Sequence, residues 1–213
     1  SDLPPAIIHL KDTCGSFAFD YQSIYSPAGL NPDNTGVIGL DDFDSSWGIW
    51  GHNLRKVLGA NTEKVYATIN GKANDSQLCF SSGEMFRLIE SYITDNFGEK
   101  GKFRFVIAPD DTPYACTCPS CTAIGNTEKN ATPAVTELIL RLSQRFPRHF
   151  FFTTSYLTTQ QVTDKQLPPN AGVIVSAINF PLRRIDGKDA KEKAFAGQLE
   201  QWKNVTKNIY IWD

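Results

Sequence analysis

The sequence predicts an α/β fold, and specifically a TIM-like (β/α) barrel in which parallel strands are covered by helices. Short, almost continuously apolar runs are typical of strands buried on both faces, and they alternate here with segments whose apolar residues recur every three or four positions. An open doubly wound parallel sheet predicts the same alternation and is the alternative. The chain has 213 residues, close to the length of about 200 residues at which a complete eight-stranded barrel becomes possible. We therefore expect one barrel-like domain over residues 1–213, truncated relative to a complete barrel.

The expected strands are apolar runs rich in β-branched and aromatic residues. The run at 65–69 ends in an Asn-Gly turn dipeptide, and the run at 103–108 leads directly into a Pro-Asp-Asp sequence. The segment 26–54 is rich in Gly, Asn, Asp and Trp without a steady period, so we expect an irregular stretch with one short strand. The expected strands cover residues 6–10, 36–40, 65–69, 103–108, 149–154, 172–178 and 209–212.

Three helices are predicted over residues 81–98, 132–146 and 189–202. Ser81 and Glu84 form a capping box at the start of the first helix. Thr132 is the expected cap of the second, with Pro133 at its first helical position, and the apolar stripe that follows ends before a proline. The third helix is expected to begin at Asp189.

Composition excludes several classes of partner. Lys and Arg number 21 and Asp and Glu 23, so no strongly basic surface for nucleic acid or for an anionic membrane is indicated. No run of about 18 apolar residues is present, so we expect no membrane span. The chain carries 4 Trp, 7 Tyr and 14 Phe, an aromatic content that suits a large core and also platforms that stack on sugar rings.

Polar residues follow the expected strands, and the carboxyl ends of parallel strands share one edge of a sheet, where α/β proteins bind ligands. Asp110 and Asp111 could supply one or both carboxyl groups for general acid/base chemistry, and we favour Asp111. The alternative is that both only cap the turn that follows. Asp213 could be a second catalytic carboxylate. The expected edge residues are Asp12, Asn70, Asp110, Asp111, Tyr156, Asn179 and Asp213.

Five cysteines include a tight Cys116-x-Cys118-x-x-Cys121 cluster. Three thiolates could bind one Zn²⁺ in a structural site, with Cys79 as the fourth ligand. Disulfides, a redox C-x-x-C pair and reduced thiols in a partly buried loop remain alternatives. A zinc hydrolase is disfavoured because thiolate-rich sites are usually closed and structural.

His52 follows Trp50 and a glycine that allows a ligand to approach the backbone closely. A lone histidine is more often structural, but His52 is our candidate for substrate binding. Trp212 is a candidate sugar platform, although core packing is the default for any tryptophan. Asn70, Tyr156 and Asn179 complete the candidate substrate-binding set.

In their order along the chain, these residues resemble the bacterial family catalogued as domain of unknown function 4838. The resemblance runs from about residue 6 to the end of the chain. It rests on Gly51-His52, on Gln77-Leu78-Cys79 before a capped helix, on the aspartate pair followed five residues later by the cysteine cluster, and on the closing Ile-Tyr-Ile-Trp-Asp. The spacing from aspartate to cysteine is its most specific part.

The resemblance implies a carbohydrate-active protein. Family members are similar to TIM-barrel glycoside hydrolases, distantly to hexosaminidases and α-glucuronidases, and many are exported by polysaccharide-degrading bacteria. In hexosaminidases an Asp-Glu pair ends the fourth strand, and its second residue is the general acid. By analogy Asp111 would be the acid and Asp110 its partner, although this chain carries Asp-Asp. The resemblance also implies a preceding α/β domain and a final part of the barrel that we do not expect within these residues.

Two functions are therefore expected. The first is an exported glycoside hydrolase acting on poly- or oligosaccharides, whose carboxyl groups protonate the leaving oxygen. The second is a noncatalytic carbohydrate-binding module that keeps the aromatic platforms and polar edge. Neither requires an organic cofactor, and the sequence leaves the sugar, the linkage and the oligomeric state open.

Overall fold

The computed structural model describes residues 19, 21–24, 26–27, 29, 31, 33–35, 39–41, 43–178 and 187–212. By its internal contacts the chain divides into two compact units, Ser1–Ser45 and Ser46–Asp213. The site lies in the second. Several predictions fall outside the described residues, namely the strand at 6–10, most of the strand at 36–40, Asp12, Cys14, Asn179 and Asp213.

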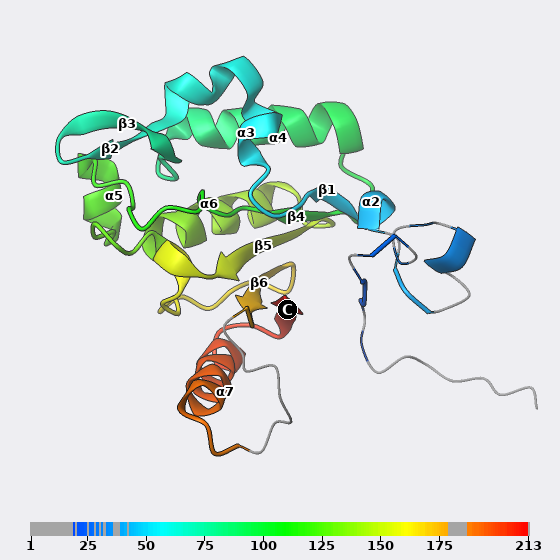
Figure 1. The fold of residues 1–213 in the computed structure, drawn as a ribbon. Helices are drawn as coiled ribbons and strands as arrows, with labels where there is room; N and C mark the ends of the chain where they lie inside the picture. Colours follow the sequence, from blue (N-terminus) through cyan, green and yellow to red (C-terminus); the bar gives the residue numbers. More distant parts are fainter. Residues whose placement is uncertain are drawn as a thin grey trace, which may run out of the picture. The chain divides into compact units, whose positions relative to one another are not determined.

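The second unit is built on a five-stranded sheet in the order β1-β4-β5-β6-β7 (Figure 1). All four strand pairs are parallel, which confirms the α/β class and the parallel sheet. Each strand is added beside the previous one without the reversal of order that a doubly wound sheet shows. The strands are β1 (Trp47–Ile49), β4 (Arg104–Val106), β5 (Phe150–Ser155), β6 (Ala171–Ser176) and β7 (Asn208–Trp212).

Helices connect the parallel strands, as crossover connections require. Three of them match the predicted helices: α4 (Gly83–Phe97), α6 (Thr132–Arg145) and α7 (Ala190–Lys203). The other elements are short. The helix α2 (Phe43–Ser46) precedes β1, and the connections between strands also contain α3 (Leu54–Leu58), α5 (Pro119–Ile124) and the 3-10 turns η1 (Gly59–Val65) and η2 (Leu157–Thr159).

The helix starts differ in detail from the predicted ones. The helix predicted to begin at Asp189 begins one residue later, and Asp189 caps it by accepting a hydrogen bond from the backbone N–H of Lys191. The cap of α4 is Ser82 and not Ser81, because the Ser82 hydroxyl reaches the backbone N–H groups of the first turn. Thr132 is the first residue of α6, and the prediction that it caps that helix is wrong.

The run at 65–69 is also different from its predicted role. It forms β2 (Tyr66–Ile69), which pairs with β3 (Lys72–Leu78) in a separate antiparallel hairpin. Asn70 has a positive φ of 52° in the turn between them, the conformation that an Asn-Gly hairpin turn requires. The prediction that Asn70 shares the edge of the parallel sheet is therefore wrong, because a turn dipeptide directly after the strand folds the chain back on itself.

One face of the sheet carries the main core. Phe105 of β4 and Phe151 of β5 stack with their ring centroids 5.5 Å apart, and they pack with buried residues of α4 and α6. On the same face at β6, Val173 packs against Trp202 of α7. Because side chains alternate along a strand, the residues before and after Phe105, Phe151 and Val173 point to the opposite face of the sheet.

That opposite face shows that the sheet is rolled. β1 and β7 are its outermost strands, and in a flat sheet with about 4.8 Å between strands they would lie about 19 Å apart. Yet the ring centroids of Trp47 in β1 and Tyr210 in β7 are only 6.1 Å apart, and both rings contact Phe152 of β5. The described strands thus form a curved sheet with an aromatic concave face, and they do not close into a barrel.

Candidate functional site

Asp110 and Asp111 lie in the loop that follows β4, at the carboxyl edge of the parallel sheet. This placement agrees with the sequence analysis. The two side chains differ in their surroundings. The Asp110 side chain is 18% exposed and the Asp111 side chain 60% exposed.

The Asp110 carboxylate is held by an arginine. Nε of Arg55, in α3, donates to Oδ2 of Asp110 at 2.7 Å. A second nitrogen of the same guanidinium donates to the backbone carbonyl of Asp75 in β3 at 2.5 Å. The arginine thus joins the loop after β4 to the β2–β3 hairpin, and the negative charge of Asp110 is compensated locally.

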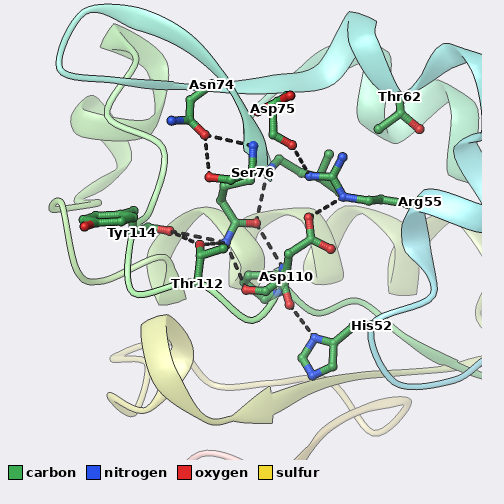
Figure 2. A network of polar contacts seen from close by, with 12 residues as sticks. His52, Arg55, Thr62, Asn74, Asp75, Ser76, Asp110, Thr112 and Tyr114 are labelled. Atoms are coloured by element: carbon green, nitrogen blue, oxygen red, sulfur yellow. Dashed lines mark hydrogen bonds and ion pairs between the residues drawn. The ribbon is translucent and has the colours of Figure 1, made fainter.

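Gln77, in β3, organises the backbone of the same loop. Gln77 is only 1% exposed. Its side-chain oxygen accepts a hydrogen bond from the backbone N–H of Asp110, and its side-chain nitrogen donates one to the Asp110 carbonyl, each at 3.1 Å. The same amide group donates to the Thr112 hydroxyl and to the Tyr114 carbonyl. Figure 2 shows Arg55 and Asp75 on one side of Asp110, with Thr112 and Tyr114 on the other.

His52 lies in the turn after β1 and reaches the same loop. Its Nδ1 lies 2.6 Å from the carbonyl oxygen of Pro109, and a carbonyl can only accept, so Nδ1 carries a proton. Nε2 lies 3.1 Å from Oδ1 of Asp111, within ion-pair distance but without hydrogen-bond alignment. A small rotation of the exposed Asp111 side chain would bring the carboxyl group and the imidazole into a shared hydrogen bond.

Two aromatic candidates lie on the same edge. Trp212 is the last residue of β7 and is 37% exposed, and its ring centroid is 6.5 Å from that of His52. Tyr156 directly follows β5 at this edge. The structure therefore brings together Asp110, Asp111, His52 and Trp212, and Tyr156 follows β5, two strands away from β1. Asn70 lies apart from them in the hairpin turn. Asn179 and Asp213 are outside the described residues.

A cavity of about 790 Å³ lies elsewhere at this end of the sheet, between η2, the end of β6 and α7. Among the residues that the structure describes, its lining includes Lys129, Lys191 and four glutamines but no carboxylate and no histidine. The loop after β4 instead brings two carboxyl groups and an imidazole together, so it is the better candidate for acid/base chemistry.

The four cysteines singled out as metal ligands come together in space. Cys79 follows β3, Cys116 lies in the loop, Cys118 caps α5, and Cys121 lies in the first turn of α5. Their sulfur atoms all lie within 4.8 Å of one another. The four cysteines are therefore close enough together to hold a metal ion.

Hydrogen bonds surround these sulfur atoms. The backbone N–H of Thr68 donates to Cys116 Sγ at 3.2 Å, and that of Cys121 donates to Cys118 Sγ at 3.4 Å. Hydrogen bonds with the thiols of Cys121 and Cys79 lower the pKa of Cys116 below its usual range, whereas hydrogen bonds with the thiols of Cys116 and Cys79 raise the pKa of Cys121. The cluster favours one negative charge and opposes several unless a cation compensates them.

All four residues are free cysteines in the structure. The sulfur pairs Cys79–Cys118 and Cys79–Cys121 are separated by 3.7 Å and 3.8 Å, far beyond the bond length of about 2.05 Å in a disulfide. Three of the four residues are buried, and Cys118 is partly exposed. This arrangement favours a closed metal site over a pair of disulfides.

Comparison with protein families identifies the chain. The family described as Domain of unknown function (DUF4838) matches residues 52–213, which include every described residue of the site. The chain belongs to the DUF4838 family. No curated protein and no solved structure matches it. Among the described helices of this DUF4838 chain, none is sufficiently long and apolar to span a membrane.

Sequence reasoning missed the two residues that organise the loop of this DUF4838 domain. Arg55 lies in none of the expected elements, and its partner Asp110 is 55 positions away. Gln77 was noticed only as part of the family resemblance. A glutamine ahead of two apolar residues and a capped helix was a usable signal, because a buried amide needs partners.

Proposed function

We propose that this domain is part of a glycoside hydrolase acting on poly- or oligosaccharides, with Asp111 as the proton donor to the leaving oxygen. The observation that carries the proposal is the pair formed by Asp111 and His52 at the carboxyl edge of a parallel, rolled sheet. This edge is where TIM-barrel enzymes carry their catalytic residues. We propose that the rolled sheet belongs to such a barrel.

Asp110 and Asp111 divide the work in this proposal. The salt bridge with Arg55 and the amide of Gln77 hold Asp110 as the fixed part of the loop. Asp111 is exposed and free to reach a substrate. With its Nδ1–H held by the Pro109 carbonyl, His52 presents Nε2 to Asp111, where it can share the proton that the acid must deliver.

Aromatic surface next to the acid supports a carbohydrate ligand. Trp212 is partly exposed beside His52, and Trp50 lies edge-on against Trp47 with ring centroids 4.8 Å apart. Sugar rings stack on exposed aromatic faces because their C–H groups are apolar. The resemblance to exported polysaccharide-degrading proteins adds the proposal that the substrate is met outside the cytoplasm.

The cysteine cluster has no step in this chemistry. Sites with four thiolate ligands are closed, and zinc bound in one stabilises the fold without activating a water molecule. We therefore assign the cluster a structural role.

Replacing Asp111 by asparagine tests the acid. A panel of aryl glycosides and oligosaccharides first identifies a substrate, and Asp111→Asn is then expected to lower kcat/KM by about 10²–10⁴-fold, as loss of a general acid does. The loss should be smaller for aryl glycosides with acidic leaving groups, because these groups depart without a proton. Asp95→Asn, an exposed acid on α4, is the matched control and should leave turnover unchanged. Unchanged turnover in Asp111→Asn would falsify the assignment.

A carbohydrate-binding module is the second candidate. It is favoured by one observation: the carboxylate next to Asp111 in the chain, that of Asp110, is already paired with Arg55 and is not free to act as a second catalytic group. Glycan binding without any turnover, lost on Trp212→Ala but kept in Asp111→Asn, would support the module over the enzyme.

A further inference from the structure

We infer that the four cysteines form a preformed tetrahedral site for a single zinc ion, and that this ion fixes the loop that carries Asp110 and Asp111. The inference goes beyond the proposed function and holds whether or not Asp111 is an acid. It rests on the separations of the sulfur atoms and on the segments that they join.

The sulfur separations match one small ion. Zinc–sulfur bonds are about 2.3 Å long, so neighbouring sulfurs in a regular ZnS₄ tetrahedron are about 3.8 Å apart. Cys79 Sγ lies 3.7 Å from Cys118 Sγ and 3.8 Å from Cys121 Sγ, and no pair in the cluster exceeds 4.8 Å. An iron–sulfur cluster would hold the cysteine sulfurs further apart, because several irons and inorganic sulfides lie between them.

The surroundings of the sulfurs suit thiolates bound to a metal. Backbone N–H groups of Thr68 and Cys121 point at Cys116 and Cys118. The Ser81 hydroxyl lies 3.0 Å from Cys121 Sγ and can donate to it. Such donors orient ligands and disperse their negative charge. Four thiolates with Zn²⁺ leave a net charge of −2, which these donors help to stabilise.

The site joins segments far apart in the sequence. Cys79 is 37 or more positions before the other three ligands. The segment that carries Cys79 and the segment that carries the other three cysteines each make hydrogen bonds next to the aspartate loop. Gln77, two residues before Cys79, holds the backbone of Asp110 and Tyr114. On the other side, Thr117 donates its N–H to the carbonyl of Thr68 in the hairpin, between two of the ligands. A bound ion therefore fixes the loop at the end opposite to the Gln77 contacts.

Metal analysis of the full chain tests the zinc site. The protein, purified without metal-affinity resin, is expected to contain about one zinc per chain and no stoichiometric iron. Exchange of the zinc for Co²⁺ should produce a thiolate-to-cobalt charge-transfer band with the visible bands of tetrahedral cobalt. Stoichiometric iron, or a reduced chain that binds neither zinc nor cobalt, would overturn the inference.

Variants separate ligands from neighbours. Cys121→Ser should lose zinc, whereas Ser81→Ala should keep about one zinc because the hydroxyl is not a ligand. Cys14→Ser is the cysteine control, since the four described cysteines already complete the tetrahedron. Should Cys121→Ser not fold, the cobalt spectrum of the unaltered chain still decides the question.

Hydrogen exchange tests the link to the loop. Removal of zinc under reducing conditions is expected to speed exchange of the amides at residues 110–117 by about tenfold or more, as local opening does, with little change in α6. Unchanged exchange in this segment would overturn the link. Neither the metal analysis nor the hydrogen exchange depends on turnover of a substrate.

Discussion

Asp110 and Asp111 are neighbours in the sequence with different surroundings in the fold. The side chain of Asp110 is paired with Arg55, and its backbone is bound by Gln77. Asp111 extends from the same loop toward solvent and His52. A dipeptide at the end of a strand can thus place one side chain in a salt bridge and the other toward solvent, because the turning chain sends the two side chains in different directions.

Replacing Gln77 by leucine should destabilise the domain by about 2–4 kcal/mol. The change leaves the partly buried N–H and carbonyl of the Asp110 backbone without the Gln77 amide, each at a cost of about 1–3 kcal/mol, while leucine preserves much of the volume. Chemical denaturation measures the free energy of unfolding.

Asn74→Ala is the matched control for Gln77→Leu. Asn74 lies on the same strand, and within the described part of the chain its side chain accepts hydrogen bonds from the nearby exposed Ser76 alone, so its loss should cost well under 1 kcal/mol. Equal effects of the two substitutions would show that Gln77 does not organise the loop.

The strands pack closely where the sheet contains glycine. At Gly172 in β6, an added Cβ would lie 2.2 Å from the carbonyl oxygen of Asn208 in β7 and 2.8 Å from the ring of Phe152 in β5. Both neighbours belong to the strands that pair with β6. The glycine therefore allows both pairings at their observed spacing.

Gly172→Ala is expected to lower the free energy of unfolding by about 1–3 kcal/mol, the usual cost of forcing extra volume into a packed interior. Gly197→Ala, in α7, is the control because an added Cβ meets nothing within 4 Å there, and alanine favours a helix over glycine by about 1 kcal/mol. The measurement is the midpoint of urea unfolding for each variant. A neutral Gly172→Ala would contradict the close packing of β6 against β7.

The roll of the sheet determines where the site can form. His52 follows β1 and Trp212 ends β7, and these outermost strands approach each other only because the sheet is curved. Trp47, Phe152 and Tyr210 fill the concave face. This packing of the second unit places the histidine, the aspartates and the tryptophan at one edge.

Tyr210→Ala should therefore cost about 2–3 kcal/mol of stability, somewhat less than a fully buried aromatic residue does, because it removes contacts to both β1 and β5. The control is Ile211→Ala, whose side chain is the next in β7 and 58% exposed, with an expected cost below about 1 kcal/mol. Thermal and urea unfolding measure both variants. If the two changes cost the same, the cross-sheet contact of Tyr210 does not support the roll.

Local patterns in the sequence were sufficient for much of this protein. Apolar runs and helix periodicity predicted the parallel strands β4 to β7 and the helices α4, α6 and α7, because buried strands and amphipathic helices follow from the nearest neighbours along the chain. The carboxylate pair at the end of β4 and the close spacing of the three cysteines could likewise be recognised from short segments of the sequence. The role of Asn70 was misjudged because a turn dipeptide does not reveal whether the next strand is antiparallel or part of a crossover.

The partners of these residues depend on contacts between distant segments. Arg55 meets Asp110 across 55 positions, Gln77 meets the same residue across 33, and Cys79 joins Cys121 across 42. No local pattern encodes such pairs, since they depend on how the hairpin and the rolled sheet pack together. The chain's residues thus predicted which groups are candidates for chemistry, and the packing of the sheet determined which of those groups meet.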